Sequence, residues 1–291
     1  MAVCRWLSCV RMLWRRTNEI RKGRLAALLE RWLCNGWEAM LTAVVGIAGL
    51  ALEARIAGGR HTRTICGGDC GALQTSIAHA ITSDCRGLIS FGIAGGLAPD
   101  LRPGSCIVAS SIVCGAGRLA TDTAWSRNAL ALIPDAVHGT IAGISDAFVT
   151  HPAAKRALRV KTGALAVDNE SHVVATVAAA HGLPMTAVRV VVDPAEREIP
   201  ASAIAAVRVD GSIDLAALAR AIGRAPGELP MLVRVAIDAL IGFAALLRCR
   251  RLLGSALGLP SLPGTDTCPS PNMEIPEATV WGLEGEYLER P

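Results

Sequence analysis

An alternation of short apolar runs with helical stretches, extending from Leu41 to Val192, is the feature that most constrains the fold. Short runs rich in Val and Ile are typical of buried strands, and the alanine-rich stretches between them are typical of helices that cover a sheet. The alternation predicts an α/β protein in three layers, with a mixed central sheet flanked by helices on both faces.

The positions of the elements follow from the same pattern and from the turn residues between them. We expect strands at 41–47, ending at Cys66, and at 87–93, 105–113, 140–144, 163–167 and 185–192. We expect helices at 72–82, from Pro152 onward, and at 173–181, 212–222 and 229–253. Glycines at 92–96 predict a turn directly after the 87–93 strand.

The core of this protein must be built from small and branched aliphatic side chains. Hydrophobic residues make up 52% of the chain, but aromatic residues make up only 3%. Such a composition suits alanine-rich helices packed on a Val/Ile-rich sheet.

The two ends of the chain differ from its centre. Residues 1–37 hold eight Arg or Lys, two Glu and four of the six Trp, whereas the remainder is nearly neutral, which argues against a nucleic-acid partner. We interpret residues 1–39 as a basic extension, either a segment lying on an anionic membrane or translated upstream sequence before a true start at Met40, and we favour the second. Residues 40–253 form the expected domain, and 254–291, with six of the fifteen prolines, a mobile tail.

The ten cysteines are irregularly spaced and no signal peptide is recognisable, so we expect reduced thiols in a cytoplasmic protein. Cys66 and Cys70 lie near His61 and His79, but their spacing matches no standard zinc pattern, so we expect no metal. The 229–253 helix is apolar on several sides. It either packs on the sheet or presents a lipid-facing surface, which would place the protein at the periphery of the inner membrane.

Four short stretches carry residues suited to chemistry. They are the glycine-rich run Phe91 to Leu97, the loop Gly143 to Val149 with Phe148, the acid pair of Asp168-Asn169-Glu170, and Asp193 before Pro194. Glycines let a backbone present N–H donors to a ligand, and paired carboxylates can bind hydroxyls or move protons. Each stretch also has a simpler structural explanation. The glycine run is then a tight turn, and Phe148 is ordinary core packing. Glu170 is an acid at a helix start, and Asp193 is a turn aspartate.

Taken together and in this order, the four stretches resemble those of methylthioadenosine/S-adenosylhomocysteine nucleosidases, over about residues 41–200. A closer resemblance is to hopanoid-associated phosphorylases, over about residues 41–253. It is carried by Gly49 to Ala57, Leu88 to Leu97, Glu170-Ser171-His172 and Ala225 to Pro230. The resemblance implies a nucleoside phosphorylase-like fold that releases adenine from adenosylhopane, an adenosyl lipid, or from a small purine nucleoside.

The resemblance also implies a role for each site residue. Asp193 would be the general acid near purine N7, and Glu53 would orient the nucleophile. Glu170, with Asn169 beside it, would bind the ribose. Phe148 would stack on adenine, and the Val149 backbone would read its edge. The run with Ile93, Gly95 and Gly96 would line the ribosyl pocket. It implies no cofactor beyond phosphate as a co-substrate, and a homo-oligomer.

Several positions depart from the family pattern. Asn169 stands where a methionine is usual, and Val192 where a serine often orients the catalytic aspartate. Ser90 and Ile93 occupy positions that hold an Arg and a Ser in hexameric purine nucleoside phosphorylases, which favours water over phosphate, with Arg55 the alternative phosphate ligand. Two other functions stay open: a soluble methylthioadenosine-type nucleosidase, and a degenerate, non-catalytic nucleoside-binding protein.

Overall fold

The structure is a computed structural model that describes residues 43–260, except residues 68, 116, 146, 147 and 209. The expected extension 1–39 and most of the expected tail therefore lie outside the described residues. The chain divides into two units, and the first of them ends at Leu259. The description below concerns that first unit.

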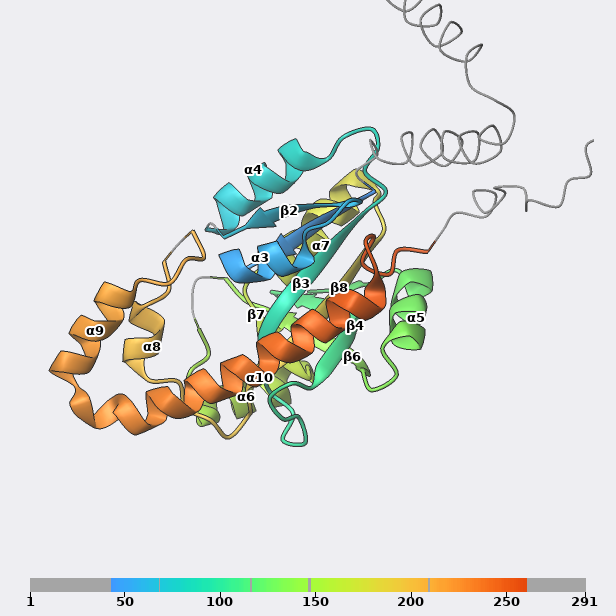
Figure 1. The fold of residues 1–291 in the computed structure, drawn as a ribbon. Coiled ribbons are helices and arrows are strands. Elements are labelled where there is room, and N and C mark those ends of the chain that lie inside the picture. Colours follow the sequence, from blue (N-terminus) through green and yellow to red (C-terminus); the bar gives the residue numbers. More distant parts are fainter. Residues whose placement is uncertain (1–42, 68, 116, 146–147, 209, 261–291) are drawn as a thin grey trace, which may run out of the picture. The chain divides into compact units, whose positions relative to one another are not determined.

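An eight-stranded mixed sheet forms the centre of the unit (Figure 1). Its strands run in the order β2-β1-β3-β7-β6-β4-β5, and β8 pairs with both β3 and β4. The strands are β1 (Val44–Ala48), β2 (Thr62–Cys66), β3 (Gly87–Gly96), β4 (Cys106–Cys114), β5 (Gly117–Ala120), β6 (Val137–Gly143), β7 (Ala166–Asp168) and β8 (Met185–Asp193).

Five of these strands close into a ring. β8 lies parallel to β3 and antiparallel to β4, β4 continues through β6 to β7, and the end of β7 returns to the end of β3. β3 and β8 contribute side chains to the cores on both faces of the sheet, and they are buried along most of their length. The predicted mixed sheet flanked by helices is confirmed, and its partial closure was not foreseen.

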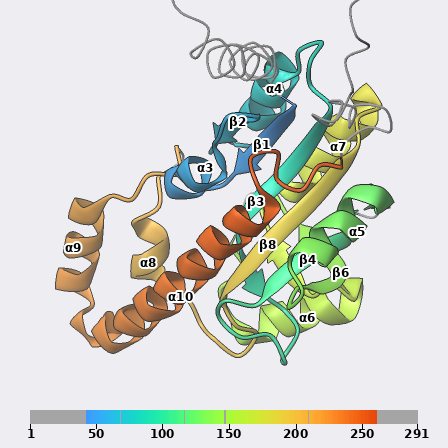
Figure 2. The same ribbon diagram turned by 45° about the vertical axis from the view of Figure 1, so that its right-hand side comes forward.

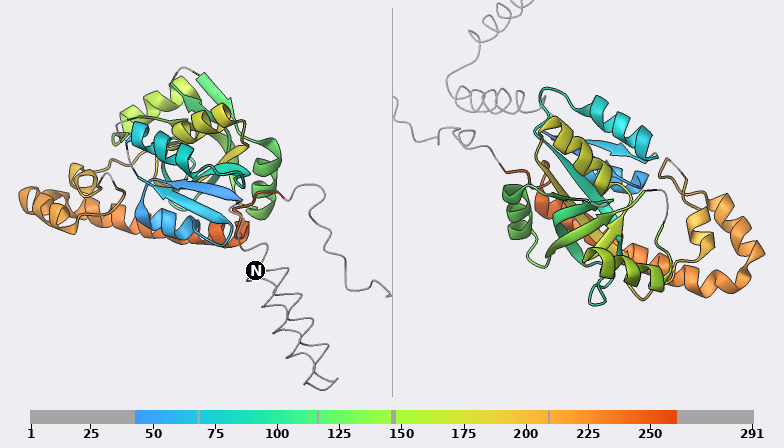
Figure 3. Two further views of the ribbon diagram at one scale, coloured as in Figure 1. Left: turned by 90° about the horizontal axis from the view of Figure 1, so that it is seen from above. Right: turned by 180° about the vertical axis from the view of Figure 1, so that it is seen from behind.

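Helices cover both faces of the sheet. α3 (Ala51–Ala57), α5 (Thr123–Leu132) and α10 (Leu229–Leu253) share a core with one face, and α4 (Cys70–Ala80) and α7 (Ser171–His181) pack on the other. Figure 1 shows the first group in front of the strands, and the right-hand view of Figure 3 shows the second group, with α6 (Pro152–Thr162).

Local sequence signals explain where the helices begin and end. Asp69 and Asp122 accept backbone N–H groups at the starts of α4 and α5, as N-cap aspartates do. Gly163 and Gly182 end α6 and α7 with φ of 70° and 64°, a conformation that glycine adopts without strain.

Two differences from the predicted elements matter for the site. The glycines at 92–96 form no turn, because β3 continues to Gly96. The pairing of β3 with β8 shifts by one residue between Ala94 and Gly95. Residues 254–259, which we assigned to the tail, instead cover the core. Leu257 is fully buried and its carbonyl accepts a hydrogen bond from the indole of Trp125 at 2.9 Å.

A group of helices at one end of the sheet completes the unit. It comprises α8 (Ala201–Ala205), α9 (Leu215–Arg224), the 3₁₀ turn η2 (Pro226–Glu228) and the first half of α10. We call residues 199–243 the C-terminal arm. Figures 1 and 2 both show α8 and α9 beyond the ends of the strands, joined to the sheet by α10. The Ser202 hydroxyl donates to the Glu228 carboxylate and ties α8 to η2.

Candidate active site

A cavity of about 1090 Å³ lies between the C-terminal arm and the carboxyl ends of β1, β7 and β8. The first residues after β1 and the ends of the other two strands bring Gly49, Asp168 and Asp193 to its wall. Ligands of α/β proteins commonly bind beyond the carboxyl ends of strands. The cavity therefore lies where the fold favours a functional site.

Glu53 is held at this wall by backbone donors. It lies in the first turn of α3 and is 1% exposed. Its Oε2 accepts the N–H groups of Gly49 and Leu50, each at 2.8 Å, and its Oε1 accepts that of Ile93 at 2.7 Å. Burial raises the pKa of the Glu53 carboxyl, against the lowering effect of Arg189 and of these N–H groups. The side chain is thus fixed in place and suited to hold a proton.

Arg189 is a fully buried cation in the middle of β8. Its Nε lies 2.7 Å from Oδ2 of Asp168, and its Nη2 lies 2.9 Å from Oε2 of Glu170. Nη2 also donates to the Ser90 hydroxyl at 2.5 Å. A buried charge is tolerated only with such compensation, so Arg189 joins the neighbouring carboxylates into one ionic cluster.

The acid pair after β7 has two distinct roles. Asp168 accepts the N–H groups of Glu170 and Ser171, and the Ser171 hydroxyl also donates to it, so Asp168 organises the start of α7. Glu170 keeps part of its carboxylate at the cavity wall, with 17% of the side chain exposed. Burial raises the pKa of Glu170 to about 7. Arg189 lowers it, and the nearby carboxylates Asp168 and Glu53 raise it.

Asp193, at the end of β8, pairs with Lys155 of α6. The Lys155 Nζ lies 2.5 Å from Oδ2 of Asp193, and the Lys155 side chain is 0% exposed. Nζ also donates to the carbonyls of Pro194 and Arg197, each at 3.0 Å. Burial raises the pKa of Asp193 to about 6, although the Lys155 ammonium lowers it. A carboxyl with such a pKa can exchange a proton near neutral pH.

Glycines allow these groups to approach the backbone. A Cβ at Gly49 would lie 2.6 Å from Oε1 of Glu170. A Cβ at Gly92 would lie 2.7 Å from the Glu53 carboxyl and 2.8 Å from Nη1 of Arg189. Glycine therefore stands, directly after β1 and within β3, where the carboxylates and the arginine lie close to the main chain.

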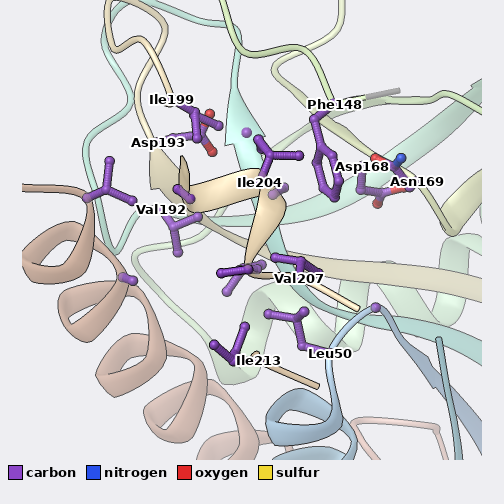
Figure 4. Close-up of a pocket in the computed structure, with 18 of the residues that line it drawn as sticks. Leu50, Phe148, Asp168, Asn169, Val192, Asp193, Ile199, Ile204, Val207 and Ile213 are labelled. Carbon is purple, nitrogen blue, oxygen red and sulfur yellow. The ribbon is translucent and has the colours of Figure 1, made fainter. Parts of the chain in front are cut away.

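The remaining predicted residues are divided between the cavity and its surroundings. Ile93, Gly95, Val149 and Asn169 line the cavity. Phe148, 49% exposed, lies beside Asp168 and Asn169 across the cavity from Asp193 (Figure 4). Gly96 does not line it: a Cβ there would meet Val191 and the backbone of Asp193 and Pro194. Gly96 thus packs on the end of β8 and is not placed to touch a ligand. Arg55 is exposed and does not line the cavity either.

Away from these polar groups, the cavity is apolar. Leu50 and, from the C-terminal arm, Ile204, Val207 and Ile213 line this part, and all four are labelled in Figure 4. Further apolar lining comes from α9 and α10, namely Leu218, Ile222, Leu232, Val235, Ala236, Ala239 and Phe243. One side of the cavity is therefore suited to polar chemistry and the other to an apolar ligand group.

Lys155 and Arg189 are functional candidates that the sequence patterns did not reveal. The available signal for Arg189 was a charged residue in the middle of an otherwise apolar strand, Met185–Asp193, which implies a buried partner. The signal for Lys155 was weaker. It lies three residues before the partly buried Leu158 and so shares a helix face with it.

Comparisons with known proteins agree with this architecture. Residues 49–222 match the family described as the Phosphorylase superfamily. A variant of the Helicobacter pylori methylthioadenosine/S-adenosylhomocysteine nucleosidase, with methylthioadenosine in its active site, has a TM-score of 0.52 at 16% identity, over 75% of this chain and 99% of that one. The futalosine hydrolase of H. pylori has a TM-score of 0.52 at 17% identity, over 74% and 97%. At these identities the likeness shows the fold. A comparison with curated protein sequences found no match.

Proposed function

The chain belongs to the phosphorylase superfamily, and from this we propose that it cleaves the N-glycosidic bond of an adenine nucleoside and releases adenine. The observation that carries the proposal is the placement of Glu170 and Asp193, two carboxyls with raised pKa, at the wall of one cavity with Phe148. Each carboxyl has a different buried cation as its partner, so the pKa of each is set independently of the other's partner.

Cleavage of this bond places positive charge on the ribosyl ring and negative charge on the leaving purine. We assign Asp193 the role of donating a proton to N7 as the bond electrons move onto the base. We assign Glu170 the binding of ribose hydroxyls, where its negative charge favours the cationic transition state. Phe148 supplies a ring face on which adenine can stack. The 49% exposure of that ring leaves it accessible to a base.

We propose water as the nucleophile. Five carboxylates and one arginine line the cavity among the described residues: Glu53, Asp69, Asp168, Glu170, Asp193 and Arg208. Arg208 already pairs with Asp214 at 2.9 Å. A phosphate dianion would meet no unpaired cation among the described residues that line the cavity, so its charge would be poorly compensated. A water molecule can instead donate to Glu53, which takes its proton as the oxygen bonds to the anomeric carbon.

The apolar side of the cavity supports a substrate whose 5′ substituent is a lipid, and we propose adenosylhopane as that substrate. Burial of apolar surface contributes about 25 cal/mol per Å² to binding, so walls such as Ile204, Val207 and Phe243 favour a large hydrocarbon group over a polar one. A small thio-nucleoside would leave much of this wall in contact with water.

Adenine release from adenosylhopane in detergent, with and without phosphate, tests the proposal directly. We expect release without phosphate. Ala239→Trp would fill the apolar part of the cavity and should raise KM for the lipid by about 10-fold or more, with little change for methylthioadenosine. Val160→Trp, on exposed α6, is a matched control.

The outcomes separate the alternatives. Release that requires phosphate would overturn the choice of water. Faster turnover of methylthioadenosine than of the lipid would identify a soluble nucleosidase. Adenine binding with no release from either substrate would identify a non-catalytic protein, the alternative that Asn169 and Val192 raise.

A further inference from the structure

The C-terminal arm carries a continuous apolar stripe on its outer surface. Leu229, Val233, Ile237 and Ile241 follow each other at four-residue intervals along α10, and each is 47–53% exposed. Leu240 of the same helix is 71% exposed, and Leu215 at the start of α9 is 72% exposed. Side chains at this spacing lie on one face of a helix, so they form a single apolar surface. A surface of this kind marks an interaction site more often than a solvated face.

This surface is continuous with the mouth of the cavity. Val233 and Leu240 belong to the stripe, and both also line the cavity. Leu52, Phe148 and Ile213 likewise line the cavity while about half exposed. The mouth is therefore bordered by exposed apolar side chains from α3, the Phe148 loop and the C-terminal arm. A partner that covers the stripe would also cover the entrance.

Arginines without an ionic partner among the described residues lie beside the stripe. Arg220, Arg224 and Arg234 are exposed, and none of them forms an ion pair with another described residue. Two acids of the C-terminal arm are in ion pairs, Asp214 with Arg208 and Asp238 with Arg197. The other two, Glu228 and Asp210, accept hydrogen bonds from Ser202 and Ser212. Apolar side chains flanked by arginines match the chemistry of an anionic lipid surface.

We propose that the exposed face of α9 and α10 docks on an anionic lipid bilayer, with the cavity mouth toward the membrane, so that the adenosyl lipid enters without passing through water. The orientation rests on the proposed lipid substrate, whereas the docking itself does not. A second copy of the chain fits less well, because a twofold contact through this face would bury three arginines from each copy in one interface.

The packing of α10 indicates that it lies on the bilayer and does not cross it. Pro226–Leu253 is long and apolar enough to span a membrane, with a mean hydropathy of 1.9. However, Leu246, Cys249 and Leu253 in its second half are buried against the sheet, and Gly242 contacts Val192 at the end of β8. The helix is therefore fixed to the domain through its second half, and its first half carries most of its exposed apolar side chains.

Flotation of the full chain with vesicles tests the docking. We expect binding to vesicles of phosphatidylcholine with about one third phosphatidylglycerol, and binding weaker by on the order of 10-fold or more to phosphatidylcholine alone. The triple variant Leu215→Ser/Leu229→Ser/Ile237→Ser should weaken binding by about 100-fold, because it removes three exposed apolar side chains that lie outside the cavity. The triple variant Arg220→Gln/Arg224→Gln/Arg234→Gln should lose the preference for anionic vesicles.

Matched controls are Val160→Ser and Arg156→Gln on α6, which should bind as the unmodified chain does. Residues 1–39 are present in every variant, so a difference in vesicle binding between variants is caused by the exposed face alone.

The serine variant should release adenine from a soluble nucleoside at the unmodified rate but act more slowly on adenosyl lipid in vesicles. Absence of vesicle binding, or equal binding by the serine variant, would overturn the docking proposal. If the serine variant instead converts an oligomer to monomer in sedimentation, the face is a subunit interface. If neither the unmodified chain nor any variant releases adenine from the soluble nucleoside, that result contradicts the proposed reaction and leaves the docking proposal unaffected.

Discussion

The ammonium of Lys155 lies 2.5 Å from the carboxylate of Asp193 in the interior of the protein. Val192, the preceding residue on β8, has no hydrogen-bonding side chain. Lys155 thus supplies, from another element, a hydrogen bond that residue 192 does not make. We therefore expect Lys155 to be a positioning residue for Asp193.

Lys155→Met should lower kcat by on the order of 10- to 100-fold, because a displaced carboxyl donates its proton poorly. It should also change the pH profile. The Lys155 charge lowers the pKa of Asp193, so its removal raises that pKa. If protonated Asp193 is the active form, its ionisation produces the falling limb of the profile, and that limb moves to higher pH.

Lys161→Met, on the exposed surface of the same helix, is the control and should leave the profile unchanged. Adding Val192→Ser to Lys155→Met should restore part of kcat, since the new hydroxyl can donate to Asp193. A profile that does not move in Lys155→Met, in a variant that circular dichroism shows to be folded, would assign Lys155 a structural role only.

Asp193→Asn should reduce adenine release by about 100-fold or more, which is the usual contribution of a general acid. The amide carbonyl that this change introduces can still accept a hydrogen bond from Lys155, so we expect adenine affinity, measured by calorimetry, to change little. Near-normal release by this variant would remove Asp193 from the mechanism.

The pH dependence of kcat/KM should be bell-shaped, with its maximum between the pKa values of about 6 for Asp193 and about 7 for Glu170. The raised pKa of Glu170 means that its anionic form, which binds the cationic transition state, predominates only above about pH 7. Activity should therefore rise as Glu170 ionises and fall as Asp193 loses its proton. Glu170→Gln should abolish the rising limb, and a rising limb that persists would assign it to another group.

Gly92→Ala should lower kcat by on the order of 100-fold, because the new methyl group would push Glu53 and Arg189 apart. Overpacking should also destabilise the protein by about 1–3 kcal/mol in urea unfolding. Gly223→Ala, which meets no atom within 4 Å, is the control and should retain activity and stability. Equal rates for the two variants would show that the Glu53–Arg189 distance does not matter.

The order of strands and helices was predictable because apolar runs and turn residues are local signals. Most of the predicted strands and helices agree with the structure to within a few residues at their ends. The polar, amphipathic α5 and the short α3, β5 and α8 were not predicted, because brief or weakly patterned segments give little periodicity. The extension of β3 through Gly96 was missed because glycine usually indicates a turn, and only pairing with β7 and β8 keeps it extended.

The site was predictable in part for a related reason. Glu170 and Asp193 stand at strand ends, where short motifs are visible in the sequence. The cations that pair with these two carboxylates are not visible in such motifs. Arg189 reaches Glu170 from another strand, and Lys155 reaches Asp193 from a helix 38 residues earlier in the chain. Such pairs depend on tertiary packing, and a single sequence carries no direct record of it.

The split between a polar wall on the sheet and an apolar wall on the C-terminal arm makes the protein modular. Glu53, Glu170, Arg189 and Asp193 all precede residue 199, and most of the apolar lining follows it. Changes in the arm can therefore alter which nucleoside is accepted while the bond-breaking groups stay fixed. Exchange of residues 199–243 between relatives offers a route to engineered selectivity, and evolution could have used the same route to adapt one catalytic centre to new substrates.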